Sequence, residues 1–315
     1  MAGSALSEPS PGYADVRPIA TVRANRCADD RYPALAGAWV IGCVSDDKVN
    51  VAVSLEDGRV VTLSDAVTSP GLADGWAWAP GRPPGGWVLP GASRGGLQGE
   101  DPLMVPFEGV SPPALARVAT AGCAGCSPWR AAVAYADHID LIDLAVHTWP
   151  RFAAHPLPGE SVALGDGWAA WTERSADTGA DVWIVQVAAG GATQAGVPTV
   201  LAGGKGDQHG VVGGGHYAWW VDGDSVVCRD VRTGTVATFP AYTGFEAGLA
   251  VTADGQYACW EDRRRLGTAA GIDIRCSDGT VIDRPGDQRW PSLGAGWLIF
   301  REGEQVLATR FPMGG

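Results

Sequence analysis

The feature that most constrains the fold of this chain is a segment that recurs along it. Each copy is a short apolar strand that follows a Gly-containing turn and ends in an aromatic residue. The clearest copies end at Trp171, Trp220, Trp260 and Phe300. These ends lie roughly 40 residues apart, and a repeat of that length with aromatic strands and glycine turns is typical of a β-propeller.

Weaker copies of the segment lie near Val40, Trp78 and Ala121. Together with the four clear copies they predict a seven-bladed propeller, with six blades as the alternative because the second and third copies match poorly. Each copy also carries a second strand in which apolar and polar residues alternate, as in "DVWIVQV" and "GIDIRCS". A period of two with many Val and Ile residues indicates strand and not helix, so we expect an all-β fold.

The last copy is one strand short. After "QVLATRF" at 305–311 the chain ends at Gly315, whereas "RPIATVR" at 17–23 precedes the first copy as a lone strand. A blade without its outer strand would expose an unpaired edge. We therefore expect 17–23 to pair with 305–311 and close the ring. Residues 17–315 then form a single propeller domain, and residues 1–16 form a flexible N-terminal segment.

Charge and composition exclude several classes of function. The chain has a net charge of -12, only 18% charged residues, 45 Gly and 22 Pro. It shows no basic stripe of the kind that binds nucleic acid, so we expect no nucleic-acid partner. It also has no apolar run of the roughly 18 residues that a membrane helix needs, so we expect no membrane insertion.

The cysteines bear on the cellular compartment. Of the 7 Cys residues, six form three predicted disulfides: Cys259–Cys276, from their placement in a hairpin, and Cys27–Cys43 and Cys123–Cys126, from their short separation. Cys228, whose equivalent in the last copy is Ala308, is the expected buried odd thiol. For "CAGC" at 123–126, two inert thiols, a redox motif and half of a zinc site are the alternatives.

These disulfides would place the protein outside the cytoplasm, in the periplasm or secreted, and without them we expect the cytoplasm. The start of the sequence lacks the charged and apolar regions of a signal peptide. An extracytoplasmic protein would therefore have lost an export signal that is not in this sequence.

Residues 155–311 resemble the TolB-like propeller repeat, which has the order P-x-L-x-G-x-x-W-x-D-x-R followed by D-I-Y. In one copy the matching residues are Trp260, Asp262, Asp273 and Ile274, with Arg263 one place early; in another they are Trp171, Glu173, Asp181, Val182 and Trp183. The first 150 residues match poorly. The resemblance implies a propeller with a binding or scaffolding role and says little about activity.

The segments that lead into the first strand of three copies share polar residues. They read "DDRYP" at 29–33, "GDQHG" at 206–210 and "GDQRWP" at 286–291. In a propeller such segments surround one mouth of the central channel, where loops on a rigid scaffold concentrate binding residues. The predicted ligand-binding residues are Arg31, Tyr32, Asp207, Gln208, His209, Asp287, Gln288, Arg289 and Trp290. For the Asp residues, capping a turn is the simpler interpretation.

Two classes of function are consistent with these sequence features. The first is a non-enzymatic binding or scaffold protein that presents the channel mouth to a protein, a glycan or a small ligand. The alternative is a lyase or hydrolase that uses His209 with Asp207 or Arg289. We expect no cofactor, because no catalytic triad, metal-ligand set or phosphate loop is present in the sequence. Calcium is a weaker alternative at Asp262 and Asp273, which face each other if Cys259 pairs with Cys276; nearby Arg263 and Arg275 predict a salt-bridged clamp instead.

Overall fold

A computed structural model shows strands joined by turns. The residues that it describes are 16–23, 34–36, 38–43, 50–62, 71–73, 76–80, 86–89, 92–93, 96–97, 103–106, 118–121, 130–134, 137–143, 151–157, 162–175, 179–187, 196–204, 206–242, 248–252, 254–268 and 271–311. Within these ranges, the structure contains no helix that is long and apolar enough to cross a membrane.

Five sheets in these ranges have four antiparallel strands each. In spatial order their strands are β11 (Leu103–Pro106), β8 (Gly86–Leu89), β7 (Trp76–Pro80) and β6 (Gly71–Ala73); β12 (Val118–Ala121), β13 (Arg130–Ala134), β14 (His138–Asp143) and β15 (Arg151–Ala153); β16 (Val162–Gly165), β17 (Trp168–Ser175), β18 (Gly179–Gln186) and β19 (Thr199–Ala202); β20 (Gln208–Gly214), β21 (Tyr217–Asp222), β22 (Ser225–Asp230) and β23 (Val236–Pro240); and β24 (Leu249–Val251), β25 (Ala258–Asp262), β26 (Asp273–Cys276) and β27 (Val281–Ile282).

The remaining described strands form one large sheet and one small one. The large sheet has eight strands, in the order β28 (Gln288–Gly294), β29 (Trp297–Glu302), β30 (Gln305–Arg310), β1 (Arg17–Arg23), β3 (Trp39–Cys43), β4 (Asn50–Ser54) and β5 (Val60–Thr62), with β2 (Ala34–Ala36) beside β3. The small sheet pairs β9 (Ala92–Ser93) with β10 (Gly96–Leu97).

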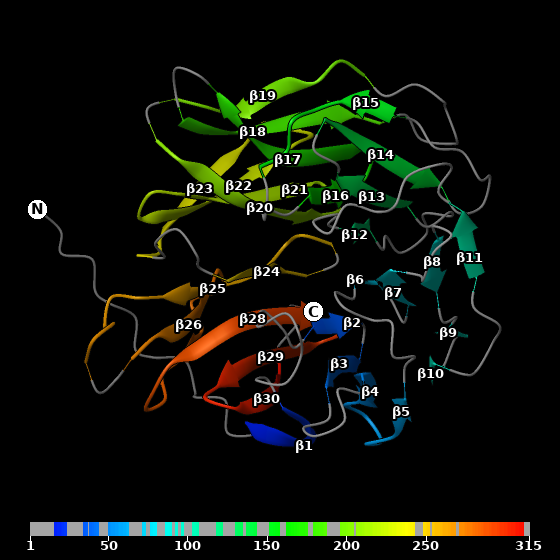
Figure 1. Ribbon diagram of the computed structural model, residues 1–315. Helices are drawn as coiled ribbons and strands as arrows, with labels where there is room; N and C mark the ends of the chain where they lie inside the picture. Colours follow the sequence, from blue (N-terminus) through cyan, green and yellow to red (C-terminus); the bar gives the residue numbers. More distant parts are fainter. Residues whose placement is uncertain are drawn as a thin grey trace, which may run out of the picture.

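The sheets are arranged around a ring (Figure 1). The innermost strands contact one another in a closed cycle of β2, β6, β12, β16, β20, β24, β28 and again β2. This is the arrangement of a β-propeller, in which the first strand of each blade faces the central axis. β1 pairs with β30 on one side and with β3 on the other, so strands that could belong to two blades form one sheet. The number of sheets therefore does not give the number of blades, and seven blades stay a prediction.

The predicted closure by the N-terminal strand is confirmed. β1 pairs antiparallel with β30, with Arg17 opposite Ala308 and Pro18 opposite Leu307. The ring of Trp297 packs below the guanidinium groups of Arg17 and Arg310, with Cζ 5.1 Å and 3.9 Å from the ring centroid. The two ends of the described chain are therefore tied together by backbone pairing and by side-chain packing.

The tryptophans of the repeated strand form much of the core. Trp168, Trp171, Trp219, Trp220, Trp260 and Trp297 are all buried. Two of them also bond across sheets: Trp168 Nε1 donates to the carbonyl of Gly215 at 3.0 Å, and Trp219 Nε1 donates to the carbonyl of Gly255 at 2.7 Å. The predicted role of these residues in packing between blades is confirmed, because a large flat ring fills that space and its N–H reaches the next turn.

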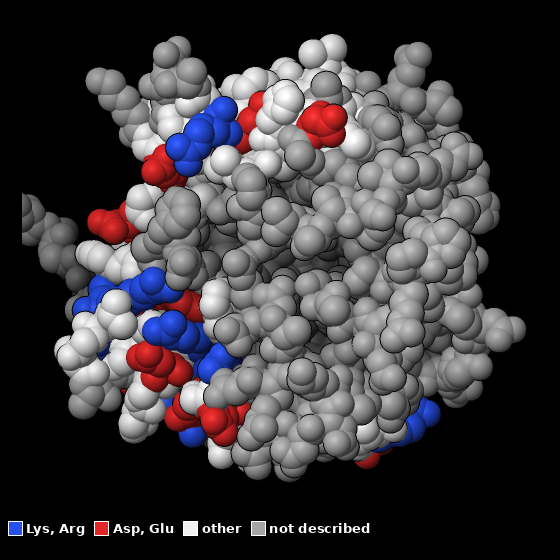
Figure 2. Space-filling model, in the orientation of Figure 1, with Lys and Arg blue, Asp and Glu red and all other residues white. Residues whose placement is uncertain are grey.

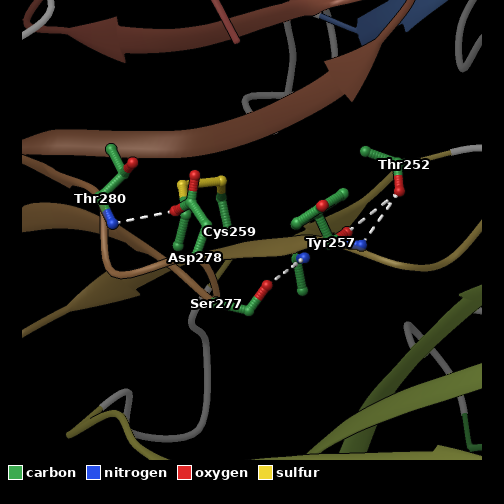
Figure 3. Close-up of a disulfide and its surroundings, with 8 residues drawn as sticks. Thr252, Tyr257, Cys259, Ser277, Asp278 and Thr280 are labelled. Carbon is green, nitrogen blue, oxygen red and sulfur yellow. Dashed lines mark hydrogen bonds between the residues drawn. A yellow bond between two sulfur atoms is a disulfide. The ribbon is translucent and has the colours of Figure 1, made fainter. Parts of the chain in front are cut away.

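One predicted disulfide is present in the described residues. Cys259 and Cys276 lie directly opposite each other on β25 and β26, and their sulfur atoms are bonded (Figure 3). Cys228 is a buried free thiol, as predicted, and burial raises its pKa to about 12. It lies opposite Trp219, in the register that Cys276 and Cys259 share. Cys27, Cys123 and Cys126 lie outside the described residues, so the other two pairings stay predictions.

Candidate functional site

Two of the three predicted rim segments, 206–210 and 286–290, can be compared directly; Arg31 and Tyr32 lie outside the described residues. In each segment the Asp residue contacts the preceding sheet. Asp207 Oδ1 accepts a hydrogen bond from Ala180 N at 3.1 Å, and Asp287 Oδ1 accepts one from Ile272 N at 3.2 Å. Both Asp residues therefore bind a backbone N–H group, as in the simpler interpretation, but this group belongs to the neighbouring sheet and not to the turn that the Asp was expected to cap.

The Gln residues of the same segments are buried and stabilise them by hydrogen bonds. Gln208 and Gln288 are both buried at the start of an innermost strand. Gln208 Nε2 donates to Asp222 Oδ1 at 3.1 Å, and Gln288 Nε2 donates to the carbonyls of Arg284 and Gly286 at 3.1 and 2.8 Å. These bonds explain both residues structurally. A ligand role for either Gln stays a prediction, and it requires a ligand that reaches below the surface.

The fourth residue differs in exposure between the segments. His209 is only 5% exposed, whereas the side chain of Arg289 is 38% exposed. Arg289 Nη2 donates to Asp287 Oδ2 at 3.1 Å, so part of its charge is neutralised within the segment. An exposed pair of this kind contributes little to stability. Of these two predicted contact residues, Arg289 is therefore the one that the surface offers to a ligand.

The fifth residue of each segment has a left-handed backbone. Gly210 has φ 66° and Trp290 has φ 55°, and in both strands the pairing register shifts at this point. Glycine adopts this conformation freely, whereas a bulky residue there is a genuine outlier. Trp290 is held in place because its backbone N donates to Glu261 Oε1 at 2.9 Å. Its side chain is partly exposed.

Glu261 is a residue of the candidate site that sequence reasoning missed. It lies at the end of β25 and is fully buried, and its Oε2 accepts a hydrogen bond from Arg263 Nη2 at 3.2 Å. Burial raises the pKa of Glu261, against the opposing effects of the Trp290 N–H and the charge of Arg263. Gly248 packs so closely that a Cβ there would lie 3.1 Å from Glu261 Oε1. The sequence offered one signal: the residue after Trp260 is an acid, whereas the equivalent residues after Trp171 and Trp220 are Thr172 and Val221.

The predicted clamp around Asp262 and Asp273 is also present. These two acids lie directly opposite each other on β25 and β26. Arg264 and Arg275 bond to Asp262, and Arg265 Nε donates to Asp273 Oδ2 at 3.1 Å while its Nη2 donates to Asp283 Oδ1 at 2.6 Å. Arg275 thus acts as predicted, whereas Arg263 serves Glu261 instead. Calcium stays the weaker alternative at this place.

The pKa values of the two acids in the clamp are shifted in opposite directions. Burial acts to raise the pKa of Asp262, but hydrogen bonds from Arg264 outweigh it, so the pKa lies below its usual value. Burial raises the pKa of Asp273, and its bonds from Arg265 offset this only in part.

Charged side chains of both signs gather over β25, β26 and β28 at the left of Figure 2. This surface is therefore rich in charge and locally balanced.

Comparison with known proteins identifies the fold and nothing finer. No protein-family model and no curated protein matches the sequence. Among solved structures, Kluyveromyces lactis Hsv2 is similar at 7% identity over 84% of this chain and 87% of that chain, with a TM-score of 0.57. The WD40 domain of SCAP from fission yeast (8% identity, 94% and 98% coverage, TM-score 0.54) and the RRP9 WD40 repeats (11%, 95% and 98%, 0.57) are similar as well. The chain folds as a β-propeller.

This likeness confirms the predicted fold class. At such low identity it carries no information on ligand, partner or activity. The resemblance to the TolB-like repeat is not tested by these structures and stays a prediction.

Proposed function

We propose that this propeller is a non-enzymatic binding protein that presents the rim around Arg289 and Trp290 to a protein, glycan or small ligand. The observation that carries the proposal is the left-handed backbone of Trp290. Such a conformation costs about 1–3 kcal/mol for a residue other than Gly, and strain of this kind clusters at functional sites. Gly210 at the equivalent place supports the view that the fold itself needs no side chain there.

The chemistry of the rim supports binding. Trp and Arg are the residue types that dominate binding energy at protein interfaces, because both offer a large flat face with hydrogen-bond donors at its edge. Trp290 and Arg289 are adjacent and partly exposed. The enzymatic alternative needs His209 at the channel mouth, and the burial of His209 favours the binding function over it.

The disulfide supports a further part of the proposal, an extracytoplasmic location, because disulfides persist in oxidising compartments. Titration of denatured but unreduced protein should detect about one free thiol per chain if all three predicted pairs form. Detection of all 7 thiols would contradict this location.

The binding function is tested with Trp290→Gly, which removes the ring and relieves the backbone. Wild-type protein and variant are screened against a random-peptide display library, a glycan array and a small-ligand thermal-shift panel. We expect a ligand class that binds the wild type and binds Trp290→Gly at least about tenfold more weakly. Arg289→Ala should weaken the same ligand.

The matched control is Gly210→Ala, which alters the equivalent position of the other segment, where a Cβ meets nothing within 4 Å. It should leave binding unchanged. Equal ligand binding by wild type and Trp290→Gly would show that the rim at Trp290 is not the binding site.

A further inference from the structure

A second aromatic residue near this rim also has a left-handed backbone. Tyr242 follows β23 with φ 47°, and the residue is 46% exposed. Both of its backbone groups are used: Tyr242 N donates to the carbonyl of Asp224 at 3.3 Å, and its carbonyl accepts a hydrogen bond from Arg263 N at 3.2 Å. Tyr242 is therefore fixed at the junction between the sheet of β20–β23 and the sheet of β24–β27.

Tyr242 and Trp290 are connected through two buried or partly buried residues. The backbone N of Arg263 bonds to Tyr242, and its Nη2 bonds to Glu261 Oε2; Glu261 Oε1 in turn accepts the N–H of Trp290. The two strained aromatics thus flank the same sheet and are held by one Arg–Glu pair. This chain of bonds ties the backbone at Tyr242 to the backbone at Trp290 through Glu261, which is fully buried and bonded at both oxygens.

Exposed side chains next to Tyr242 add apolar and cationic groups. The guanidinium of Arg264 lies over the Tyr242 ring, with Cζ 5.2 Å from its centroid, and Leu266 two residues later is 54% exposed. Hydrogen bonds from Leu266 N to the Arg263 carbonyl and from Thr268 N to the Arg265 carbonyl hold this turn. An arginine stacked on a tyrosine is pre-organised, so less entropy is lost when it binds a ligand.

The arginines keep spare hydrogen-bond donors. A guanidinium has five N–H groups. Arg264 uses Nε and Nη2 on Asp262, and Arg265 uses Nε and Nη2 on Asp273 and Asp283, so within the described residues their Nη1 groups have no hydrogen-bond acceptor. A carboxylate on a ligand would accept hydrogen bonds from these Nη1 groups. Little side-chain entropy would be lost, because the guanidinium planes are already held in place.

We infer that Tyr242, Arg264 and Leu266 form, with Trp290, one docking surface for a peptide segment that carries carboxylates beside apolar side chains. The inference rests on the proposed function and extends it to a partner class. Carboxylates match the free Nη1 donors, and apolar side chains match Tyr242 and Leu266. A nucleic acid is disfavoured, because it would bring a row of phosphates against a chain with a net charge of -12, whereas a peptide can present a single carboxylate to the Nη1 groups.

The test is selection of a random-peptide display library on the wild-type protein. We expect selected peptides to be enriched in Asp or Glu together with Leu, Phe or Trp, and their binding to weaken as salt is raised. Synthesised peptides should bind Tyr242→Gly and Arg264→Gln at least about tenfold more weakly than the wild type. Tyr242→Gly suits the left-handed backbone, so the variant keeps the fold.

The matched control is Val236→Ala, which removes an apolar side chain of similar exposure on β23 and should leave peptide binding unchanged. The inference is overturned if no peptide binds above background, if the peptides are enriched in Lys and Arg, or if they bind Tyr242→Gly and Arg264→Gln as well as the wild type. A peptide or glycan lost only in Trp290→Gly would overturn this inference while the proposed function stands.

Discussion

The two segments 206–210 and 286–290 share a framework and differ in what it presents. In both, the Asp residue bonds to the preceding sheet, the Gln residue is buried, and the fifth residue is left-handed. In the first segment that residue is Gly210 and the fourth is the buried His209. In the second, the corresponding residues are Trp290 and the partly exposed Arg289. The two segments therefore share a backbone framework, while the side chains that it presents to solvent differ.

The difference originates in the preceding sheet. Glu261 holds the amide of Trp290, whereas Thr172 stands at the corresponding place before Gly210. Thr172 is buried, and its Oγ1 has no hydrogen-bond partner among the described residues. A strained Trp thus occurs where a buried carboxylate supports it, and a relaxed Gly occurs where no such support is present.

The largest effect expected from this comparison is on stability at Glu261. Glu261→Ala leaves the Arg263 guanidinium without its acid and the Trp290 amide without an acceptor, so we expect a loss of about 3–5 kcal/mol in the free energy of unfolding. Thr172→Ala should cost about 1 kcal/mol or less, because it removes only a methyl group and an unbonded hydroxyl. Denaturant unfolding measures both. Similar losses for the two variants would show that the Glu261 bridge does not stabilise the fold.

The next effect concerns the strands that carry these residues. Replacing both Cys259 and Cys276 with Ala should cost about 2–3 kcal/mol, because the disulfide closes a short loop in the unfolded chain. Cys228→Ala, in the corresponding β21–β22 pair, should cost about 1 kcal/mol by loss of packing alone. Thermal melts without reductant compare them, and an equal loss would argue against a stabilising crosslink.

A smaller effect separates the two left-handed residues. Gly210→Ala should cost about 1 kcal/mol from backbone strain, because the new Cβ has open space around it. Trp290→Gly should stay within about 1 kcal/mol of the wild type, since relief of strain offsets lost packing, and Trp290→Ala should be less stable than Trp290→Gly. Denaturant unfolding of the two Trp290 variants shows which is more stable and thereby whether the backbone is strained. A more stable Ala variant would show that the strain is absent in solution.

The smallest effect is a dependence on pH. Burial raises the pKa of Glu261 above its usual value of about 4.5. The unfolded chain therefore loses this proton first as the pH rises, so the wild type should lose stability relative to Glu261→Gln from about pH 4.5 until the folded-state pKa is passed. Melts from about pH 4 to about pH 7 measure the difference. Thr172→Val, at the place without a titratable group, should differ from the wild type by the same amount at every pH.

Much of the fold was predictable from the sequence because the signals were periodic or paired. The aromatic repeat predicted the propeller, and the shortfall of the last copy predicted the pairing of β1 with β30. The hairpin position of Cys259 and Cys276 predicted their disulfide and, by the same register, the opposition of Asp262 and Asp273. Each of these follows from strand spacing, which local sequence specifies.

The exposure of the candidate site residues was only partly predictable. Sequence alone selected Arg289 and Trp290, which are partly exposed, but it selected His209, Gln208 and Gln288 equally, although all three are buried. Recurrence in a repeat marks equivalent backbone positions, and it does not tell which side chains reach the surface.

By itself, the sequence determined the all-β repeat, the closure of the ring and one cross-strand disulfide, because these depend on residues a fixed number of places apart. Only the tertiary structure decided that Glu261 supports Trp290, that Arg263 connects Glu261 to Tyr242, and that both aromatics are left-handed. Those features depend on contacts between neighbouring sheets, which bring together residues that no single repeat contains. Burial and backbone strain are set there, since the preceding sheet determines what each rim residue can bond to.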